Sequence, residues 1–179
     1  EEYRISSKVI EDLQEVMSCT MCSLCDEGCT TLVVDKSFLG PAAMTKAYRV
    51  AKDPRHTKSK SRLKEWSEVR GMWDCVHCWE ASEHCPWGIE PTHLIMDMRD
   101  QSVALGVKSG RDNKAAARHY NAFAKSVQES GWLNERELAM KTYGLPPYGM
   151  SPSGIISQTP LALKALRRGK ASLLPHVKR

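Results

Sequence analysis

The stretch Cys19-Thr-Met-Cys22-Ser-Leu-Cys25-Asp-Glu-Gly-Cys29 has the spacing C-x2-C-x2-C-x3-C. This spacing is typical of loops that bind iron–sulfur clusters, because two-residue gaps let a tight loop turn three thiolates onto one cluster. We expect Gly28 to supply the backbone freedom that the loop needs where it leaves the cluster. The fourth cysteine of such a run normally binds a second cluster, so the stretch predicts another motif further along the chain.

That second motif is Cys75-Val-His-Cys78-Trp-Glu-Ala-Ser-Glu-His-Cys85-Pro86, and it is incomplete. A full run would place its third cysteine at position 81, where the chain has Ala81. Because the fourth ligands cross over, the spacing predicts a first cluster bound by Cys19, Cys22, Cys25 and Cys85. The thiolates that remain for a second cluster are those of Cys29, Cys75 and Cys78.

The number of thiolates limits the type of each cluster. A full set of four predicts a 4Fe–4S centre at the first site. A set of three predicts either a 3Fe–4S centre or a 4Fe–4S centre whose fourth ligand is not a cysteine. Alanine cannot bind iron, so a substitute ligand would have to be water or one of the neighbouring side chains, namely those of Ser82, Glu83, His84 and His77.

Two other uses of the cysteines are less well supported. The chain has seven cysteines, an odd number, and no signal-peptide pattern, so we expect a reducing compartment, a cytoplasmic location and no structural disulfides. A zinc site built from the two C-x2-C pairs would leave three cysteines without a role and would not explain the Cys85-Pro86 ending.

Charge is distributed unevenly along the 179 residues. The net charge is +5, yet no acidic residue follows Glu137, and seven lysines and arginines lie beyond it. Such a basic tail predicts contact with an acidic partner, a nucleic acid or an anionic membrane face, unless it is simply solvated. No apolar run reaches the roughly 18 residues of a membrane span, so we expect no transmembrane segment.

Hydrophobic spacing predicts a mainly α protein. We expect helices over 7–17, 41–52, 60–70, 112–130, 134–141 and 159–168 and another from 91, with one short strand at 31–34. Residues 144–160 are rich in Pro, Gly and Ser and predict an extended linker. The expected domains are therefore 1–143, which holds both motifs, and 144–179, a linker and basic C-terminal helix for partner docking.

Apolar residues at helical spacing also predict which faces are buried. The expected buried residues are Ile10, Leu13, Val16 and Met17 in the first helix, Leu94, Ile95, Met98 and Val103 in the helix from 91, and Ala116, Tyr120, Phe123, Ala124 and Val127 in 112–130. Three tryptophans, Trp73, Trp79 and Trp87, surround the second motif. They predict either a dry shell around the clusters or ordinary core packing.

Segments outside the cysteine motifs resemble known families. Phe38-Leu39-Gly40-Pro41-Ala-Ala-Met-Thr-Lys-Ala-Tyr48-Arg49 and the Cys85-Pro86-Trp-Gly88-Ile-Glu-Pro91 ending resemble the C-terminal domain of succinate dehydrogenase iron–sulfur subunits. Gly131-Trp-Leu-Asn-Glu135 and Arg168-Gly169-Lys170-Ala-Ser-Leu-Leu-Pro175-His176 are similar to the electron-transferring iron–sulfur subunit of heterodisulfide reductases. Both resemblances imply an alpha-helical ferredoxin-type domain that holds two iron–sulfur clusters.

The sequence also departs from both families. Relatives with two 4Fe–4S centres have eight cysteines, and this chain has Ala81 in place of the eighth. The three-thiolate site of succinate dehydrogenase subunits lacks the cysteine corresponding to Cys78 and keeps the one at position 81. No CCG motif of a catalytic heterodisulfide reductase subunit is present, so the resemblance implies that the catalytic subunit is another chain.

The implied function is electron transfer without catalytic residues. The resemblance predicts a heterodisulfide reductase-like subunit in sulfur metabolism, which relays electrons between a flavin- or cluster-bearing donor and a catalytic subunit of the CCG type. The alternative is the iron–sulfur subunit of a succinate or fumarate oxidoreductase. A third hypothesis is a nucleic-acid-associated protein, but the sequence has no recognised nucleic-acid motif, so we expect no such partner.

Overall fold

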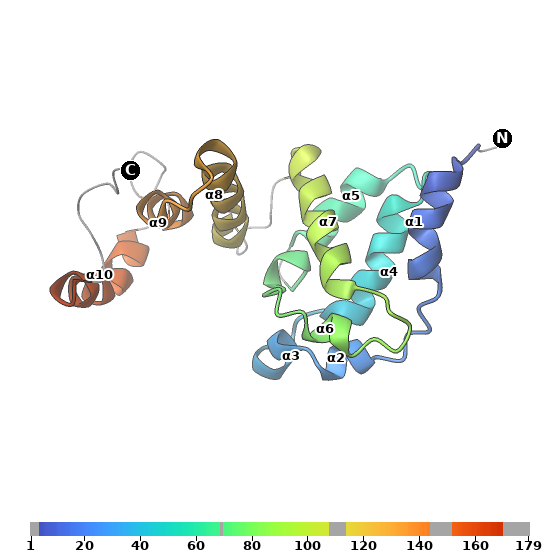
Figure 1. Ribbon diagram of the computed structural model, residues 1–179, viewed down its shortest axis with the longest axis horizontal. Helices are drawn as coiled ribbons and strands as arrows, with labels where there is room; N and C mark the ends of the chain where they lie inside the picture. Colours follow the sequence, from blue (N-terminus) through green and yellow to red (C-terminus); the bar gives the residue numbers. More distant parts are fainter. Residues whose placement is uncertain (1–3, 69, 108–113, 144–151, 170–179) are drawn as a thin grey trace. The chain divides into compact units, whose positions relative to one another are not determined.

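The computed structural model describes residues 4–68, 70–107, 114–143 and 152–169, and all regular secondary structure in these ranges is helical (Figure 1). The expectation of a mainly α protein is confirmed. The chain divides into two compact units, Glu1–Lys114 and Ala115–Arg179. This division precedes the boundary at 143/144 that we expected, and the docking role of residues 144–179 stays a prediction.

The first unit contains both cysteine motifs (Figure 1). Its elements are α1 (Ser7–Met17), α2 (Leu24–Glu27), α3 (Thr30–Val34), α4 (Gly40–Lys52), α5 (Ser59–Trp66), a 3-10 turn (Met72–Asp74), α6 (Glu80–Glu83) and α7 (Pro91–Ala104). Helices α1, α4 and α7 lie where the sequence predicted them. Within the described ranges, no helix is both long and apolar enough to span a bilayer.

The core of the first unit forms where α4 and α7 pack together, with α1 and α5 against α4. Its fully buried side chains include Val16, Met44, Leu63, Met72, Ile95 and Met98. In α1 only half of the predicted face is buried, because Leu13 and Val16 are covered while Ile10 and Met17 are exposed. In α7 the prediction for Val103 is wrong, since Val103 is exposed and its neighbour Ser102 is buried.

The predicted strand at 31–34 is wrong, because Thr30–Val34 forms the short helix α3. Its β-branched residues favour a strand locally, but contacts to the second motif determine the conformation. Thr30 Oγ1 donates a hydrogen bond to Cys78 Sγ at 3.3 Å, and Thr31 Oγ1 donates one to the carbonyl of Asp74 at 3.4 Å. The helix therefore holds the residues that follow Cys29 against the start of the second motif.

Gly40 is required at the start of α4. Its φ is +85°, and a Cβ added there would lie 2.6 Å from Asp26 Oδ1. That carboxylate oxygen accepts a hydrogen bond from the Ala42 N–H at 2.9 Å and so fixes the first turn of α4. Left-handed φ and close approach together leave room only for glycine.

We expect Gly40→Ala to lower the unfolding free energy by about 2 kcal/mol, because strained φ and a clash act together. Gly106→Ala is the matched control, since Gly106 has a φ of +63° but open space around its Cα. Thermal melts followed by circular dichroism under anaerobic conditions should show the larger loss for Gly40→Ala. Equal losses would show that the contact with Asp26 contributes nothing.

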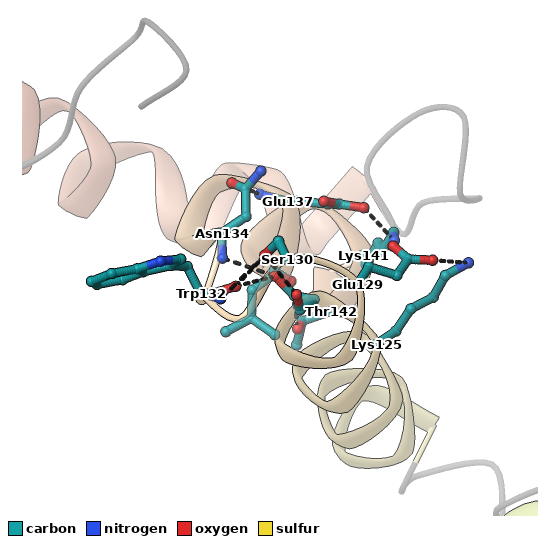
Figure 2. A network of polar contacts seen from close by, with 10 residues as sticks. Lys125, Glu129, Ser130, Trp132, Asn134, Glu137, Lys141 and Thr142 are labelled. Carbon is teal, nitrogen blue, oxygen red and sulfur yellow. Dashed lines mark hydrogen bonds and ion pairs between the residues drawn. The ribbon is translucent and has the colours of Figure 1, made fainter. Parts of the chain in front are cut away.

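The second unit contains α8 (Lys114–Ser130), α9 (Glu135–Tyr143) and α10 (Pro152–Arg167). A polar turn joins α8 to α9, in which the Ser130 hydroxyl donates to the carbonyl of Trp132 at 2.8 Å (Figure 2). Asn134 caps α9 as predicted, because its Oδ1 accepts the N–H of Glu137 at 3.2 Å. Figure 2 also shows the indole of Trp132 directed away from this network, and that side chain is 75% exposed.

The buried face of α8 differs from the predicted one. Ala122 and Ser126 are buried, whereas Phe123 and Val127 are exposed. Arg118 on the same side donates from Nε to the carbonyl of Thr142 at 3.1 Å, so this is the side that meets α9. The polar turn after α8 selects the buried face, and the hydrophobic spacing of the sequence does not show this.

Helix α10 begins earlier than predicted. We expected a linker to residue 160 and a helix from 159, but Pro152–Arg167 is one helix that contains Pro160. Proline suits the first turn of a helix, so a segment rich in Pro, Gly and Ser can open a helix as well as form a linker. Residues 144–151 of the expected linker lie outside the described residues.

Candidate iron–sulfur cluster sites

Four cysteine side chains from both motifs surround one cavity in the first unit, and they are Cys19, Cys22, Cys25 and Cys85. The remaining lining is mostly apolar and comprises Thr20, Met21, Ser23, Ala42, Thr45, Pro86, Trp87, Ile89 and Pro91. This arrangement brings together the four residues that the crossed spacing predicted for the first cluster. A mostly apolar cavity lined by four cysteines fits an iron–sulfur centre, whose ligands are thiolates.

The backbone of the first loop is strained in a specific pattern. Met21 has a φ of +59° and Ser23 a φ of +61°, and Cys25 follows within α2. Each left-handed residue other than glycine costs about 1–2 kcal/mol. Alternation of left-handed and right-handed residues turns successive N–H groups toward one concave side, where they bind anions. A backbone of this kind is suited to enclosing an anionic group.

The second loop repeats this backbone. His77 has a φ of +55° and Trp79 a φ of +65°, at the same spacing from Cys75 as Met21 and Ser23 have from Cys19. Within the described ranges, the other non-glycine residue with positive φ is Arg70. Ala81 then lies in α6 at the place that Cys25 occupies in α2. The second loop has the conformation of the first and differs from it in the missing thiol.

The thiols of Cys29, Cys75 and Cys78 lie near one another. Burial, and then the neighbouring thiols of Cys29 and Cys78, raise the pKa of Cys75. Burial also acts to raise the pKa of Cys78, but hydrogen bonds from Thr30 and from backbone N–H groups lower it overall. Cys78 and Cys29, which comes from the first motif, are thus both close enough to Cys75 to influence its thiol.

At the first site, the pKa of Cys25 is raised to about 12, mainly by burial and by the carboxylate of Asp26, and then by Cys85 and Cys19. A thiol with such a pKa keeps its proton at neutral pH. Metal ions bind the thiolate, so iron binding at this site releases protons.

Residues 15–89 match the sequence model of the 4Fe-4S dicluster domain. This segment includes all seven cysteines. The match covers less than half of the chain, and we call the matching segment the dicluster domain.

The chain is also similar to iron–sulfur subunits of fumarate reductases. It is 29% identical over 158 residues to the 8-methylmenaquinol:fumarate reductase iron-sulfur subunit of Wolinella succinogenes. The match covers 87% of this chain and 46% of that protein. It is 32% identical over 84 residues to the fumarate reductase iron-sulfur subunit of Escherichia coli. This match covers 47% of this chain and 34% of that protein.

A third such relative is the fumarate reductase iron-sulfur subunit of Mycobacterium tuberculosis, 31% identical over 94 residues, which are 52% of this chain and 38% of that protein. This chain therefore spans less than half the length of the relatives it matches. These similarities support the resemblance to succinate and fumarate enzymes more strongly than the resemblance to heterodisulfide reductases.

A basic side chain supports the first cysteine of each loop of the dicluster domain. Lys46 on α4 donates from Nζ to the carbonyl of Cys19 at 2.7 Å. Arg99 on α7 donates from Nη2 to the carbonyl of Cys75 at 2.7 Å and from Nε to the carbonyl of Met72 at 2.9 Å. Arg99 is only 5% exposed, so its charge lies buried beside the second loop.

Neither of these basic residues was predicted from the sequence, although a signal for Arg99 exists. Arg99 falls on the same helical face as Ile95, Met98 and Ser102, all of which are buried. An arginine on an apolar face must find buried acceptors, because an unpaired buried charge is very costly. Its guanidinium also lies 5.1 Å from the ring centre of Trp73. The periodicity of α7 could therefore have identified Arg99 as a structural cation.

Two of the neighbours proposed as substitute ligands have buried polar atoms. Nε2 of His77 and Oγ of Ser82 are buried and have no hydrogen-bond partner among the described residues. Burial, together with the charge of Arg99, lowers the pKa of His77 to about 4, so its imidazole is neutral at physiological pH. Glu83, by contrast, is exposed.

The ring of His84 packs against Gly28 and bonds through Nδ1 to the carbonyl of Glu80 at 2.8 Å. A Cβ on Gly28 would lie 2.5 Å from that Nδ1. Gly28 has a φ of −76°, which any residue adopts, so our reason for this glycine was wrong. It is needed for space, because His84 approaches the backbone closely just before Cys29.

The tryptophans around the second motif differ in exposure. Trp73 is buried, but Trp79 is 42% exposed and Trp87 is 59% exposed. Both predicted roles, a dry shell and ordinary core packing, are therefore wrong for Trp79 and Trp87, whereas the burial of Trp73 agrees with either. Since Trp87 also lines the cavity of the first site, that site has an edge open to solvent or to another protein.

Proposed function

We propose that this chain is an electron-transfer subunit of an oxidoreductase complex and that its dicluster domain relays electrons between two iron–sulfur clusters. The proposal rests on the two sets of cysteines described above, each of which contains residues from both motifs. The packing of α2 against α6 places the two loops side by side (Figure 1). Adjacent clusters in one small domain are suited to moving electrons from one side of a protein to the other.

In this proposal Cys19, Cys22, Cys25 and Cys85 hold a 4Fe–4S cluster, and Cys29, Cys75 and Cys78 hold the second cluster. Each cluster supplies one-electron oxidation and reduction, with a potential set by its charge, hydrogen bonds and solvent exposure. The protein would hold the clusters, surround the first site with a mostly apolar lining and supply cations behind each loop. It needs no catalytic residue for this task.

The test is chemical analysis of the full chain after anaerobic purification. We expect a brown protein with about seven to eight iron atoms per chain and a similar amount of acid-labile sulfide, as two clusters require. Stoichiometric zinc without sulfide would contradict the proposal. Iron and sulfide for only one cluster would contradict the relay.

The partner we favour is the flavin-bearing catalytic subunit of a succinate- or fumarate-converting enzyme. The support is similarity to the iron-sulfur subunit of a fumarate reductase over 87% of this chain. The rival is a heterodisulfide reductase-like complex, favoured by the presence of Cys78 and by the pattern Gly131–Glu135. Anaerobic co-purification separates them, since the first predicts a flavoprotein with fumarate reductase activity and the second predicts a CCG-type subunit.

Deletion of residues 152–179 should release the partner and leave both clusters in place. Helix α10 exposes Ile156, Leu161 and Leu163. Its basic residues near the C-terminal end, Lys164, Arg167 and Arg168, are also exposed. Charge would steer an acidic partner to this helix, and burial of the leucines would retain it.

The deletion is checked by co-purification and by iron content. A truncated chain that still purifies with the whole complex would contradict docking through α10. Loss of iron on truncation would show that the segment is needed for the dicluster domain to fold. Charge reversal at Arg167 and Arg168 is the milder companion variant and should weaken the complex most at low salt.

A further inference from the structure

We propose that Nε2 of His77 is the fourth protein ligand of the second cluster, which is then a 4Fe–4S centre with three thiolates and one imidazole. The inference rests on the proposed function, in which the dicluster domain binds two clusters. It concerns the ligand that takes the place of the missing cysteine at position 81.

The second loop keeps the form of a loop that binds a four-iron cluster. His77 and Trp79 repeat the left-handed backbone of Met21 and Ser23, and α6 begins where α2 begins in the first loop. Holding two non-glycine residues left-handed strains the backbone. This strain persists although Ala81 has removed a ligand. The loop is therefore shaped for a complete cluster.

The position of His77 in the second loop suits a ligand of the second cluster. It corresponds in the loop to Met21, whose side chain lines the cavity of the first cluster, and the two residues share nearly the same φ. The side chain at 77 thus leaves the backbone as the side chain at 21 does. His77 also lies between two thiolate ligands, Cys75 and Cys78, and its backbone N–H donates to the thiolate of Cys75.

The buried nitrogen of His77 needs a partner. Nε2 is buried and has no hydrogen-bond partner among the described residues. An unsatisfied buried polar atom is destabilising, and such atoms are rare unless they have a role. Imidazole nitrogen is a good ligand for iron, and imidazoles replace two thiolates in Rieske centres. A bond to the fourth iron would satisfy this nitrogen.

The other neighbours are less well placed. Ser82 corresponds to Asp26 of the first loop, whose carboxylate turns to the Ala42 N–H at the start of α4. Oγ of Ser82 is also buried and without a partner among the described residues, so Ser82 is the rival ligand, but imidazole nitrogen is the better ligand for iron. Nδ1 of His84 is bonded to the carbonyl of Glu80, its ring packs on Gly28, and the side chain of Glu83 is exposed.

An imidazole ligand has a consequence for electron transfer. Imidazole is neutral and thiolate is anionic, so a cluster with one imidazole carries one negative charge fewer than the first cluster. Replacing thiolate by imidazole raises the reduction potential of iron–sulfur centres. The buried charge of Arg99 beside the loop acts in the same direction. We therefore expect the second cluster to be the first to be reduced.

The test uses the full chain, reconstituted anaerobically with iron and sulfide and labelled with 15N in histidine only. Pulsed electron paramagnetic resonance of the partly reduced protein should show hyperfine coupling of one histidine nitrogen to the second cluster. His77→Ala should abolish this coupling, and iron should fall from about eight to about seven atoms as the unprotected corner is lost. His84→Ala, the matched control, should retain both.

Ala81→Cys combined with His77→Ala keeps the test decisive if the single variant fails to bind its second cluster. The double variant should restore about eight iron atoms with no histidine coupling and with a lower potential than the wild type. Absence of histidine coupling in the wild type, coupling that survives in His77→Ala, or a 3Fe–4S signal from the freshly prepared wild type would each overturn the proposal. In each of these cases two clusters are still bound, so the proposed function survives; loss of iron or sulfide altogether would contradict that function instead.

Discussion

Cys85→Ser is expected to abolish the first cluster and leave the second, although Cys85 belongs to the second motif. The reason is that Cys85 lines one cavity with Cys19, Cys22 and Cys25. Removing one of four thiolates leaves one corner of the cluster without its anionic ligand. We expect the loss of about four iron atoms per chain, measured by iron analysis and Mössbauer spectroscopy.

Cys29→Ser is the reciprocal variant and should damage the second cluster alone. Cys29 is buried, and α3 holds the following residue, Thr30, in a hydrogen bond to Cys78. If each substitution instead harmed the cluster of its own motif, the crossed assignment would be wrong. Alanine variants at both positions exclude the complication that a serine oxygen can still bind iron.

The cysteine spacing was enough to predict that cysteines from both motifs line one cavity, while the binding of two clusters stays a prediction. Spacing limits which thiols can reach a common point, and the cavity around Cys19 and Cys85 follows from that constraint. The same holds for helices that open with proline, since Pro41 and Pro91 lie in the first turns of α4 and α7. These features are local, so they can be read from neighbouring residues.

Features that depend on distant contacts could not be predicted in this way. The residues of α3 favour a strand, and contacts of Thr30 and Thr31 with the second motif make them helical. The left-handed backbone at Met21 and His77 has no signature in residue type, because neither is glycine or asparagine. Comparison of the two motifs with each other would have revealed that their backbones repeat.

Arg99→Met is expected to destabilise the second loop and its cluster while leaving the first cluster bound. Methionine preserves much of the apolar stem but removes the donors to the carbonyls of Met72 and Cys75. Each buried acceptor left unsatisfied costs about 1–3 kcal/mol, so the total loss is roughly 2–6 kcal/mol. A domain of this size has about 5–15 kcal/mol of stability, so the effect is large.

The charge of Arg99 gives the variant a second effect that packing alone does not produce. A buried cation stabilises the reduced, more negative cluster, so its removal should lower the potential of the second cluster. Arg99→Lys should keep that potential nearer to the wild-type value while still weakening the loop, because lysine retains the charge but not the forked geometry. Redox titration followed by electron paramagnetic resonance separates the charge from the hydrogen bonds.

Lys46→Met is the matched control, since Lys46 supports the carbonyl of Cys19 in the first loop as Arg99 supports that of Cys75. It should affect the first cluster alone, and less strongly, because Lys46 is half-buried and its hydrogen bond to that carbonyl is a single one. A shift of both clusters by either variant would show that these cations act through the fold as a whole. If Arg99→Met left the reduction potential of the second cluster and the stability of the protein unchanged, Arg99 would have no influence on the second site.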